Sequence, residues 1–196
     1  MSGDWNQHIE LENDWVRLIP ADPVHAEELA AICSVDTFKF FVRDLPRTID
    51  APGLTDFINR LIATPNVQPY TVVDKLTGNI AGMTCFMDIR AAHLGLEIGW
   101  TWYGPQFRGT KVNPAAKLLL ITHAMEELGA IRVQLKCDER NLHSQRAIEK
   151  LGAVKEGVLR QHGIQLDGTI RNSVMYSITK LEWPSVKANL LSRCQL

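Results

Sequence analysis

"LEIGWTWYGPQFRGTKVN" (96–113) joins an alternating strand to a glycine-flanked basic loop, and the Ala/Leu run behind it is typical of a buried helix. Asn113 is a good N-cap and Pro114 suits the first helical position, so the sequence predicts that this helix begins there. The strand spans 94–103 and alternation predicts two faces: Leu94, Leu96, Ile98, Trp100 and Trp102 on one, and Gly95, Glu97, Gly99, Thr101 and Tyr103 on the other.

The loop between the strand and the helix has the composition of an anion site. The first N–H groups of a helix have no intrahelical partner and carry the positive end of the helix dipole. Gly109 allows the preceding amides to turn inward, and Arg108 and Lys111 add positive charge. These features favour a phosphate or pyrophosphate at the helix end. A solvated surface loop is the alternative.

The same loop comes close to the phosphate loop of nucleotide-hydrolysing proteins. In that motif a Lys directly follows the glycine to reach the β- and γ-phosphates, and the next hydroxyl binds magnesium. Here Thr110 and Lys111 stand in the reverse order after Gly109, which misdirects both groups. A nucleotide-binding protein is therefore the weaker alternative.

Composition bounds the class of protein. With 196 residues, 45% apolar and 22% charged, the chain fits one globular domain, 1–196. A net charge of -1 gives no general argument for nucleic acid or an anionic membrane as partner. No apolar run reaches about 18 residues and no secretory h-region is visible, so we expect a cytoplasmic protein without a membrane segment. The cysteines lack metal-ligand spacing, so we expect no metal and mostly buried, reduced thiols at Cys33, Cys85, Cys137 and Cys194.

The order of the expected elements indicates an α+β (α/β-like) fold. Strands are expected over 15–20, 70–74, 80–89, 94–103, 133–138, 157–164 and 173–181. Helices are expected over 24–35, 52–63, from 114, over 142–151 and over 183–192. A meander comes first and later strands alternate with helices, which predicts one mixed sheet covered by helices on both faces.

Two segments, "LEIGWTWYGPQFRGTKVN" and "LKCDERNLHSQRAIEKLGA" (135–153), together with the last two strands, resemble the GNAT-type N-acetyltransferase superfamily. Within it the chain is most similar to the branch that includes the ribosomal-protein N-terminal (alanine/serine) acetyltransferases. The resemblance covers nearly the whole chain and is strongest over 94–183. It implies the GNAT fold, with a mostly antiparallel sheet of six to seven strands, and acetyl-CoA as co-substrate.

The resemblance also implies where the co-substrate binds. The family's Q/R-x-x-G-x-G/A loop wraps the pyrophosphate with backbone amides, and here it departs from the pattern at Lys111. Family members splay the strand before this loop from its neighbour, which frees its backbone for the pantetheine. The implied cofactor-binding residues are Ile98, Trp100, Trp102, Gln106, Phe107, Arg108, Gly109, Thr110, Lys111, Asn113, Asn141 and Ser144.

Asn141 and Ser144 form the family's N-x-x-S motif and share a helix face with Ala147, Ile148 and Leu151. The residues alone favour Asn141 as a helix cap, with Ser144 bonded back to the backbone. The resemblance instead implies that both line the coenzyme channel near the pantetheine and the sulfur.

The resemblance identifies the catalytic residues less completely than the cofactor-binding residues. The family reaction is attack of a neutral amine on the thioester. Many relatives carry a Tyr seven residues after the Asn as acid for the thiolate. Ile148 stands there, which makes Ser144 the substitute candidate. The candidate bases are Glu97, acting through water, and His162; a merely solvated Glu97 is the alternative. A non-catalytic acyl-CoA-binding or sensing module is the rival function.

The acceptor is expected to be a peptide or small-molecule amine. An α-amine of pKa about 7.8 is over about a tenth neutral at pH 7, whereas a lysine of pKa about 10.4 is almost fully charged. A site without a strong base therefore suits α-amines better. In the family the segment 37–48 walls the acceptor cleft, here with Phe38, Phe40, Phe41 and Arg43, and core packing is the alternative for Trp100 and Trp102. We also expect a homodimer.

Overall fold

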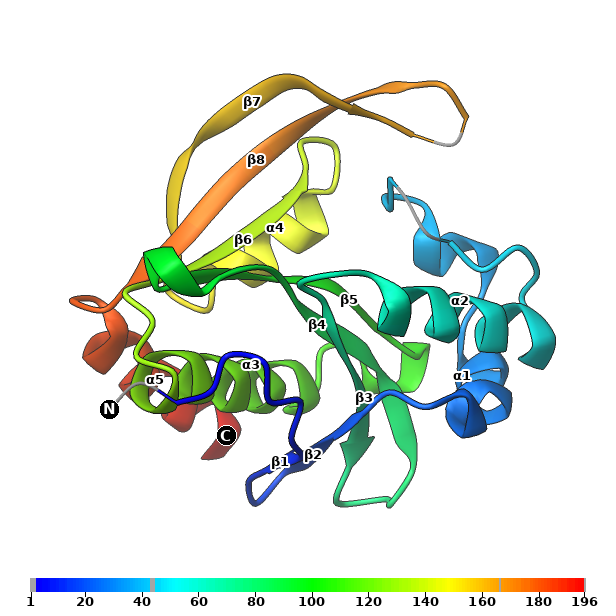
Figure 1. The fold of residues 1–196 in the computed structure, drawn as a ribbon, viewed down its shortest axis with the longest axis horizontal. Coiled ribbons are helices and arrows are strands. Elements are labelled where there is room, and N and C mark those ends of the chain that lie inside the picture. The colour runs from blue at the N-terminus through cyan, green and yellow to red at the C-terminus, as the bar shows by residue number, and fades with distance from the viewer. Residues whose placement is uncertain (1–2, 43–44, 166, 196) are drawn as a thin grey trace.

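One eight-stranded sheet lies between two layers of helices in the computed structural model, which describes residues 3–42, 45–165 and 167–195 (Figure 1). The strand order is β1-β2-β3-β4-β5-β6-β8-β7, and only β5 and β6 run parallel within it. The strands are β1 (Leu11–Glu12), β2 (Val16–Pro20), β3 (Gln68–Asp74), β4 (Ile80–Arg90), β5 (Gly95–Tyr103), β6 (Arg132–Asp138), β7 (Val154–Ile164) and β8 (Ile170–Thr179). The mixed, mostly antiparallel sheet is confirmed, and the two-residue β1 adds one strand to the expected number.

The helices cover both faces of the sheet, as the sequence predicted. They are α1 (Ala26–Ile32), α2 (Ala51–Ala63), α3 (Val112–Thr122), α4 (Leu142–Glu149) and α5 (Trp183–Gln195). Helices α3, α4 and α5 bury one face in the larger core, and α1 and α2 bury part of the other in a second core. In Figure 1, β3, β4 and β5 lie on the side of α1 and α2, whereas β6, β7 and β8 lie on the side of α4.

A β-bulge interrupts β5 where the sequence predicted strict alternation. Met83 pairs with Trp102 and Cys85 with Gly99, so Trp100 and Thr101 together lie opposite one residue of β4. Trp100 has φ +44°, a strained value for an aromatic residue. Because of the extra residue, Ile98 packs in the larger core and Trp102 in the second. The prediction that Ile98, Trp100 and Trp102 share one face is wrong.

The long β7–β8 hairpin forms the far edge of the sheet and arches towards the segment before α2 (Figure 1). A Cβ added to Gly163 would lie 3.3 Å from Val42 Cγ1, so the hairpin touches that segment. The hairpin and the segment thus border the same side of the sheet.

Within the described ranges, no helix is both long and apolar enough to cross a membrane. In the same residues no group of three or more His, Cys, Asp or Glu side chains is placed to hold a metal ion. The cysteines are mostly buried, as expected: Cys85, Cys137 and Cys194 lie in the interior and Cys33 is half-buried.

Candidate active site

Strands β5 and β6 separate in the middle of the sheet. They pair only at Gly95↔Arg132, Leu96↔Val133 and Glu97↔Gln134. Beyond Glu97, β5 pairs only with β4, and β6 pairs only with β8. The facing edges therefore carry backbone groups that the sheet does not use, and such groups need other partners. An extended ligand can bind in this splay between the two strands.

The loop 104–111 closes one end of the splay and leads into α3. Arg108 donates from Nε to the Tyr103 carbonyl oxygen at 2.9 Å, which ties the loop to the end of β5. The Thr110 hydroxyl donates to the Phe107 carbonyl at 2.8 Å and accepts from the Val112 N–H at 3.3 Å. Gln106, Arg108, Gly109, Thr110 and Lys111 are exposed, whereas Phe107 is buried in the core. The loop thus has a fixed base and an open outer surface.

Helix α3 begins at Val112, not at the expected N-cap Asn113. The Thr110 hydroxyl accepts the Val112 N–H, and the Ala115 N–H already donates to the Lys111 carbonyl. Asn113 therefore lies in the first turn and is half-buried. Since Val112 and Ala115 already donate within the chain and Pro114 has no N–H, the first turn leaves few N–H groups for a ligand. The helix begins closer to Gly109 than predicted.

Gly109 has φ +75°, in the left-handed region that favours glycine. A Cβ added there would meet no heavy atom within 4 Å, so the chain itself leaves open space above this backbone. An open surface with a turned backbone suits the close approach of an anionic group. The requirement for glycine comes from the backbone angle and not from crowding within the protein.

Helix α4 brings the N-x-x-S motif to the β6 side of the splay. Asn141 caps the helix by accepting the Ser144 N–H at 3.0 Å, the role that the residues alone favoured. Burial raises the pKa of the Cys137 thiol, and the nearby Ser144 hydroxyl offsets part of that effect. Ile148 is buried in the larger core. Ser144 is half-buried, and it lies in the first turn of α4, which follows the end of β6.

Glu97 lies at the point where β5 and β6 part. Its carboxylate is buried and accepts from Lys136 Nζ at 2.9 Å and from Gln134 Nε2 at 2.8 Å. The merely solvated carboxylate that was the alternative is therefore excluded. Lys136 neutralises a charge that would otherwise be costly to bury. The pair fixes the position of the carboxylate on the sheet face opposite α3.

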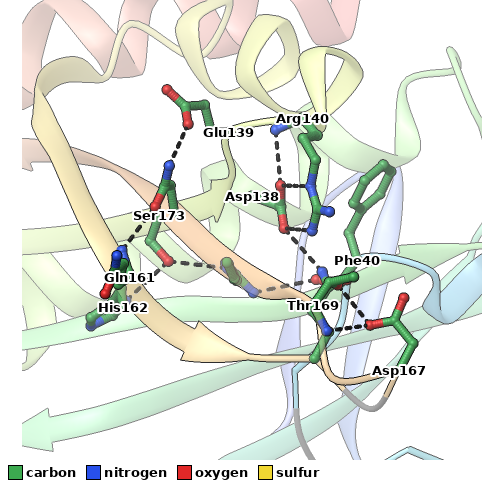
Figure 2. A network of polar contacts seen from close by, with 12 residues as sticks. Phe40, Asp138, Glu139, Arg140, Gln161, His162, Asp167, Thr169 and Ser173 are labelled. Atoms are coloured by element: carbon green, nitrogen blue, oxygen red, sulfur yellow. Dashed lines mark hydrogen bonds and ion pairs between the residues drawn. The ribbon is translucent and has the colours of Figure 1, made fainter.

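His162 belongs to a polar network between β7, β8 and the segment before α2 (Figure 2). Its Nδ1 lies 3.0 Å from Ser173 Oγ, and the same oxygen accepts from Arg171 Nε at 3.0 Å. Arg171 also donates to the Phe40 carbonyl at 3.3 Å, which connects β8 to the segment before α2. Burial lowers the pKa of Arg171. The structure does not bring His162 into contact with Glu97, so the two candidate bases are separate.

Asp138, at the end of β6, anchors the other half of this network (Figure 2). Burial acts to raise its pKa, but hydrogen bonds from Arg140 outweigh that effect and the pKa is lowered. Its Oδ2 accepts from Arg140 Nη2 at 2.8 Å and from Gln165 Nε2 at 3.0 Å. Sequence analysis missed Asp138 and Arg171. For Asp138 the available signal was a charged residue on the polar face of the predicted strand 133–138, whereas Arg171 lies in β8 before the predicted start of that strand at 173.

Some of the aromatic side chains expected to line the acceptor cleft are instead packed in the protein core. Phe38 is buried, 5.6 Å between ring centroids from Trp102 and 6.0 Å from Phe57. Core packing, the alternative for Trp102, is therefore what its side chain does. Trp100, Phe40 and Phe41 are half-buried, and Trp100 and Phe41 also pack against the second core. Arg43, the cation expected beside them, lies outside the described residues.

Comparisons with known proteins agree with this geometry. Residues 16–154 match the model of the acetyltransferase (GNAT) domain. YdaF of Bacillus subtilis, provisionally named a ribosomal N-acetyltransferase, is 33% identical over 110 residues, which are 56% of this chain and 59% of YdaF. A provisionally assigned acetyltransferase from T. thermophilus superposes with a TM-score of 0.90 at 36% identity, covering 97% of this chain and 99% of that one. Mycobacterium smegmatis RimJ, solved with CoA-disulfide, shares the fold with a TM-score of 0.76 at 18% identity, over 93% of this chain and 92% of RimJ.

The splayed strands, the basic loop and the helix behind it define an acyltransferase fold. The chain belongs to the GNAT acetyltransferase family. The match to YdaF spans about six tenths of that protein's length.

Proposed function

We propose that the whole chain is a single N-acetyltransferase domain that transfers the acetyl group of acetyl-CoA to a primary amine by direct attack. The acceptor is a protein N-terminal α-amine or a small-molecule amine. The observation that supports this most is the end of β5–β6 pairing at Glu97, directly before the loop with Gly109. RimJ has the same fold and was solved with CoA-disulfide.

Acetyl-CoA supplies an activated acetyl group and a thiolate leaving group. In our proposal, the loop Gln106–Lys111 binds its diphosphate through the backbone amides from Gly109 to Lys111 and of Asn113, where Arg108 and Lys111 add charge. The amides of Phe107 and Arg108 already donate to carbonyl oxygens within the loop. Ile98, Trp100 and Trp102 contribute their backbone edge, and Asn113, Asn141 and Ser144 border the same channel. The Trp102 side chain takes no part, because it is buried in the second core.

We assign proton transfer to the groups on either side of the splay. Glu97 accepts the ammonium proton through water, and its carboxylate is held in place by Lys136. Ser144 is the proposed donor to the departing thiolate. The reaction depends little on this donor, since a thiol of pKa about 8.5 leaves as the anion near neutral pH. His162 is the second candidate base, placed at the hairpin that borders the acceptor side.

A turnover assay that detects free thiol tests the proposal. We expect acetyl-CoA-dependent thiol release with at least one acceptor from a panel of N-terminal peptides of ribosomal proteins, polyamines, aminoglycosides and amino acids. Peptide α-amines are expected to exceed lysine side chains, because more of their population is neutral at pH 7. Tight binding of acetyl-CoA without release above background would instead support the non-catalytic sensing module. A larger thermal shift with ATP and magnesium than with CoA would support the nucleotide-binding alternative.

Matched variants separate the two candidate bases. Glu97→Gln keeps the shape and an acceptor for Lys136 while removing the charge. It should lower kcat by on the order of a hundredfold without changing the KM for acetyl-CoA much. His162→Asn keeps a side chain that can bond Ser173 and should change kcat by less than about threefold. The reverse ranking would transfer the role of base to His162.

A further inference from the structure

Lys117 is a buried lysine in the middle of α3. It is 4% exposed and lies in the Ala/Leu run that faces the sheet. Its Nζ donates to Thr101 Oγ1 at 2.6 Å and to Thr84 Oγ1 at 3.2 Å. Among the residues that the structure describes, no carboxylate lies within 4.0 Å of its ammonium. An apolar residue of similar size would cost less to bury.

The two threonines that bind Lys117 are the residues that face each other across the bulge. Thr101 is one of the two β5 residues that oppose Thr84 of β4. The two hydroxyl oxygens lie 2.8 Å apart, so the three polar groups form a closed cluster. Thr84 is fully buried, which leaves Lys117 and Thr101 as its side-chain partners. The Lys117 amino group therefore connects α3 to both strands at the bulge itself.

The bulge determines how the residues of β5 that border the splay are oriented. It lies beyond Glu97, where β5 no longer pairs with β6. It turns Trp102 into the second core and leaves Trp100 half-buried at φ +44°. Such a conformation persists only where surrounding contacts hold it. The Lys117 cluster is a contact of this kind, because it replaces a regular strand pair at Thr84 with hydrogen bonds to the helix.

We propose that Lys117 is a positioning residue, whose amino group holds the bulged segment of β5, through hydrogen bonds to Thr84 and Thr101, in the conformation that receives the acyl group. The inference rests on the proposed function for its effect on turnover. Lys117 does not touch the substrates; it acts through Thr101 and the backbone of Gly99–Tyr103. A misplacement of about 1 Å at a reacting group can cost on the order of a hundredfold in rate.

Three variants test the role. Lys117→Met keeps the apolar stem and removes the donors, and Thr101→Val removes one acceptor at nearly constant volume. Ile121→Val, also fully buried in α3, is the control, because it shortens a core side chain of the same helix and removes no hydrogen-bonding group of the cluster. We expect Lys117→Met to lower kcat at least about tenfold while the KM for acetyl-CoA changes less than about twofold. Combining it with Thr101→Val should add little, because both changes break the same cluster.

Hydrogen exchange provides a readout that does not depend on activity. Amides of Gly99–Tyr103 should exchange faster in Lys117→Met and in Thr101→Val, but not in Ile121→Val. Unchanged exchange at these amides would overturn the positioning role, as would faster exchange with unchanged kcat. If the wild-type protein turns over no amine while exchange still rises in Lys117→Met, the bulge role stands and the proposed function is wrong.

Discussion

Replacing Lys117 by Met is expected to change how the stability of the protein depends on pH. Burial lowers the pKa of Lys117 from its ordinary value of 10.5 to about 7, and the neighbouring Cys85 offsets little of this. Between these two pH values the unfolded chain binds a proton that the folded chain does not. The free energy of unfolding of the wild type therefore rises with pH in this window, and Lys117 has no such effect below it, where both states are charged.

The magnitude follows from the two pKa values. Each pH unit within the window is worth about 1.4 kcal/mol, or about 5 kcal/mol over its whole width. Between pH 7 and pH 9 the wild type should gain about 2 kcal/mol relative to Lys117→Met, since the slope is only half developed near pH 7. The thiol of Cys85 does not interfere, because burial raises its pKa to about 12.

Urea unfolding of both proteins, followed by circular dichroism at several pH values, measures this difference. Subtracting the two curves cancels the groups that they share. A difference that stays constant from pH 7 to pH 9 would refute the reasoning and would mean that Lys117 is charged in the folded protein throughout. A difference that falls with pH would contradict its sign.

Other substitutions probe the loop and the helix ends. Gly109→Ala should raise the KM for acetyl-CoA several-fold and leave the KM for the amine unchanged, because an alanine at φ +75° costs about 1 kcal/mol. Steady-state kinetics measures both values, and equal effects on the two substrates would contradict the assigned role. Asn141→Ala should lower the free energy of unfolding by about 1 kcal/mol and Asn141→Asp by much less, because only the aspartate can still accept the Ser144 N–H. Chemical denaturation compares them, and equal losses would show that the cap contributes nothing.

Local patterns predicted the elements well. The hairpin of β3 and β4, the strand β6 and the helix α4 lie close to their predicted bounds, because each has a clear period and clear end signals. The beginning of α3 was wrong, since Asn113 and Pro114 have good local propensities but the Thr110 hydroxyl takes the Val112 N–H first.

The features missed by sequence analysis depend on residues distant in the chain. The alternation of β5 gave no sign of a bulge at Trp100, because Lys117 and Thr84 lie 16 and 17 residues from Thr101 and bind it only in the folded protein. Glu97 was expected on an outer face, and it is buried because Lys136 on the next strand pairs with it. The loop around Gly109 was predictable, because glycine, basic residues and a following helix are neighbours in sequence.

Hydrogen exchange of the wild-type protein, with and without CoA, tests the central proposal most directly. If the coenzyme lies in the splay with its diphosphate at α3, the amides of Gln106–Asn113 and Ile98–Trp102 should become protected together, with those of β1 and β2 unchanged. Protection elsewhere, or none at saturating CoA, would contradict the account.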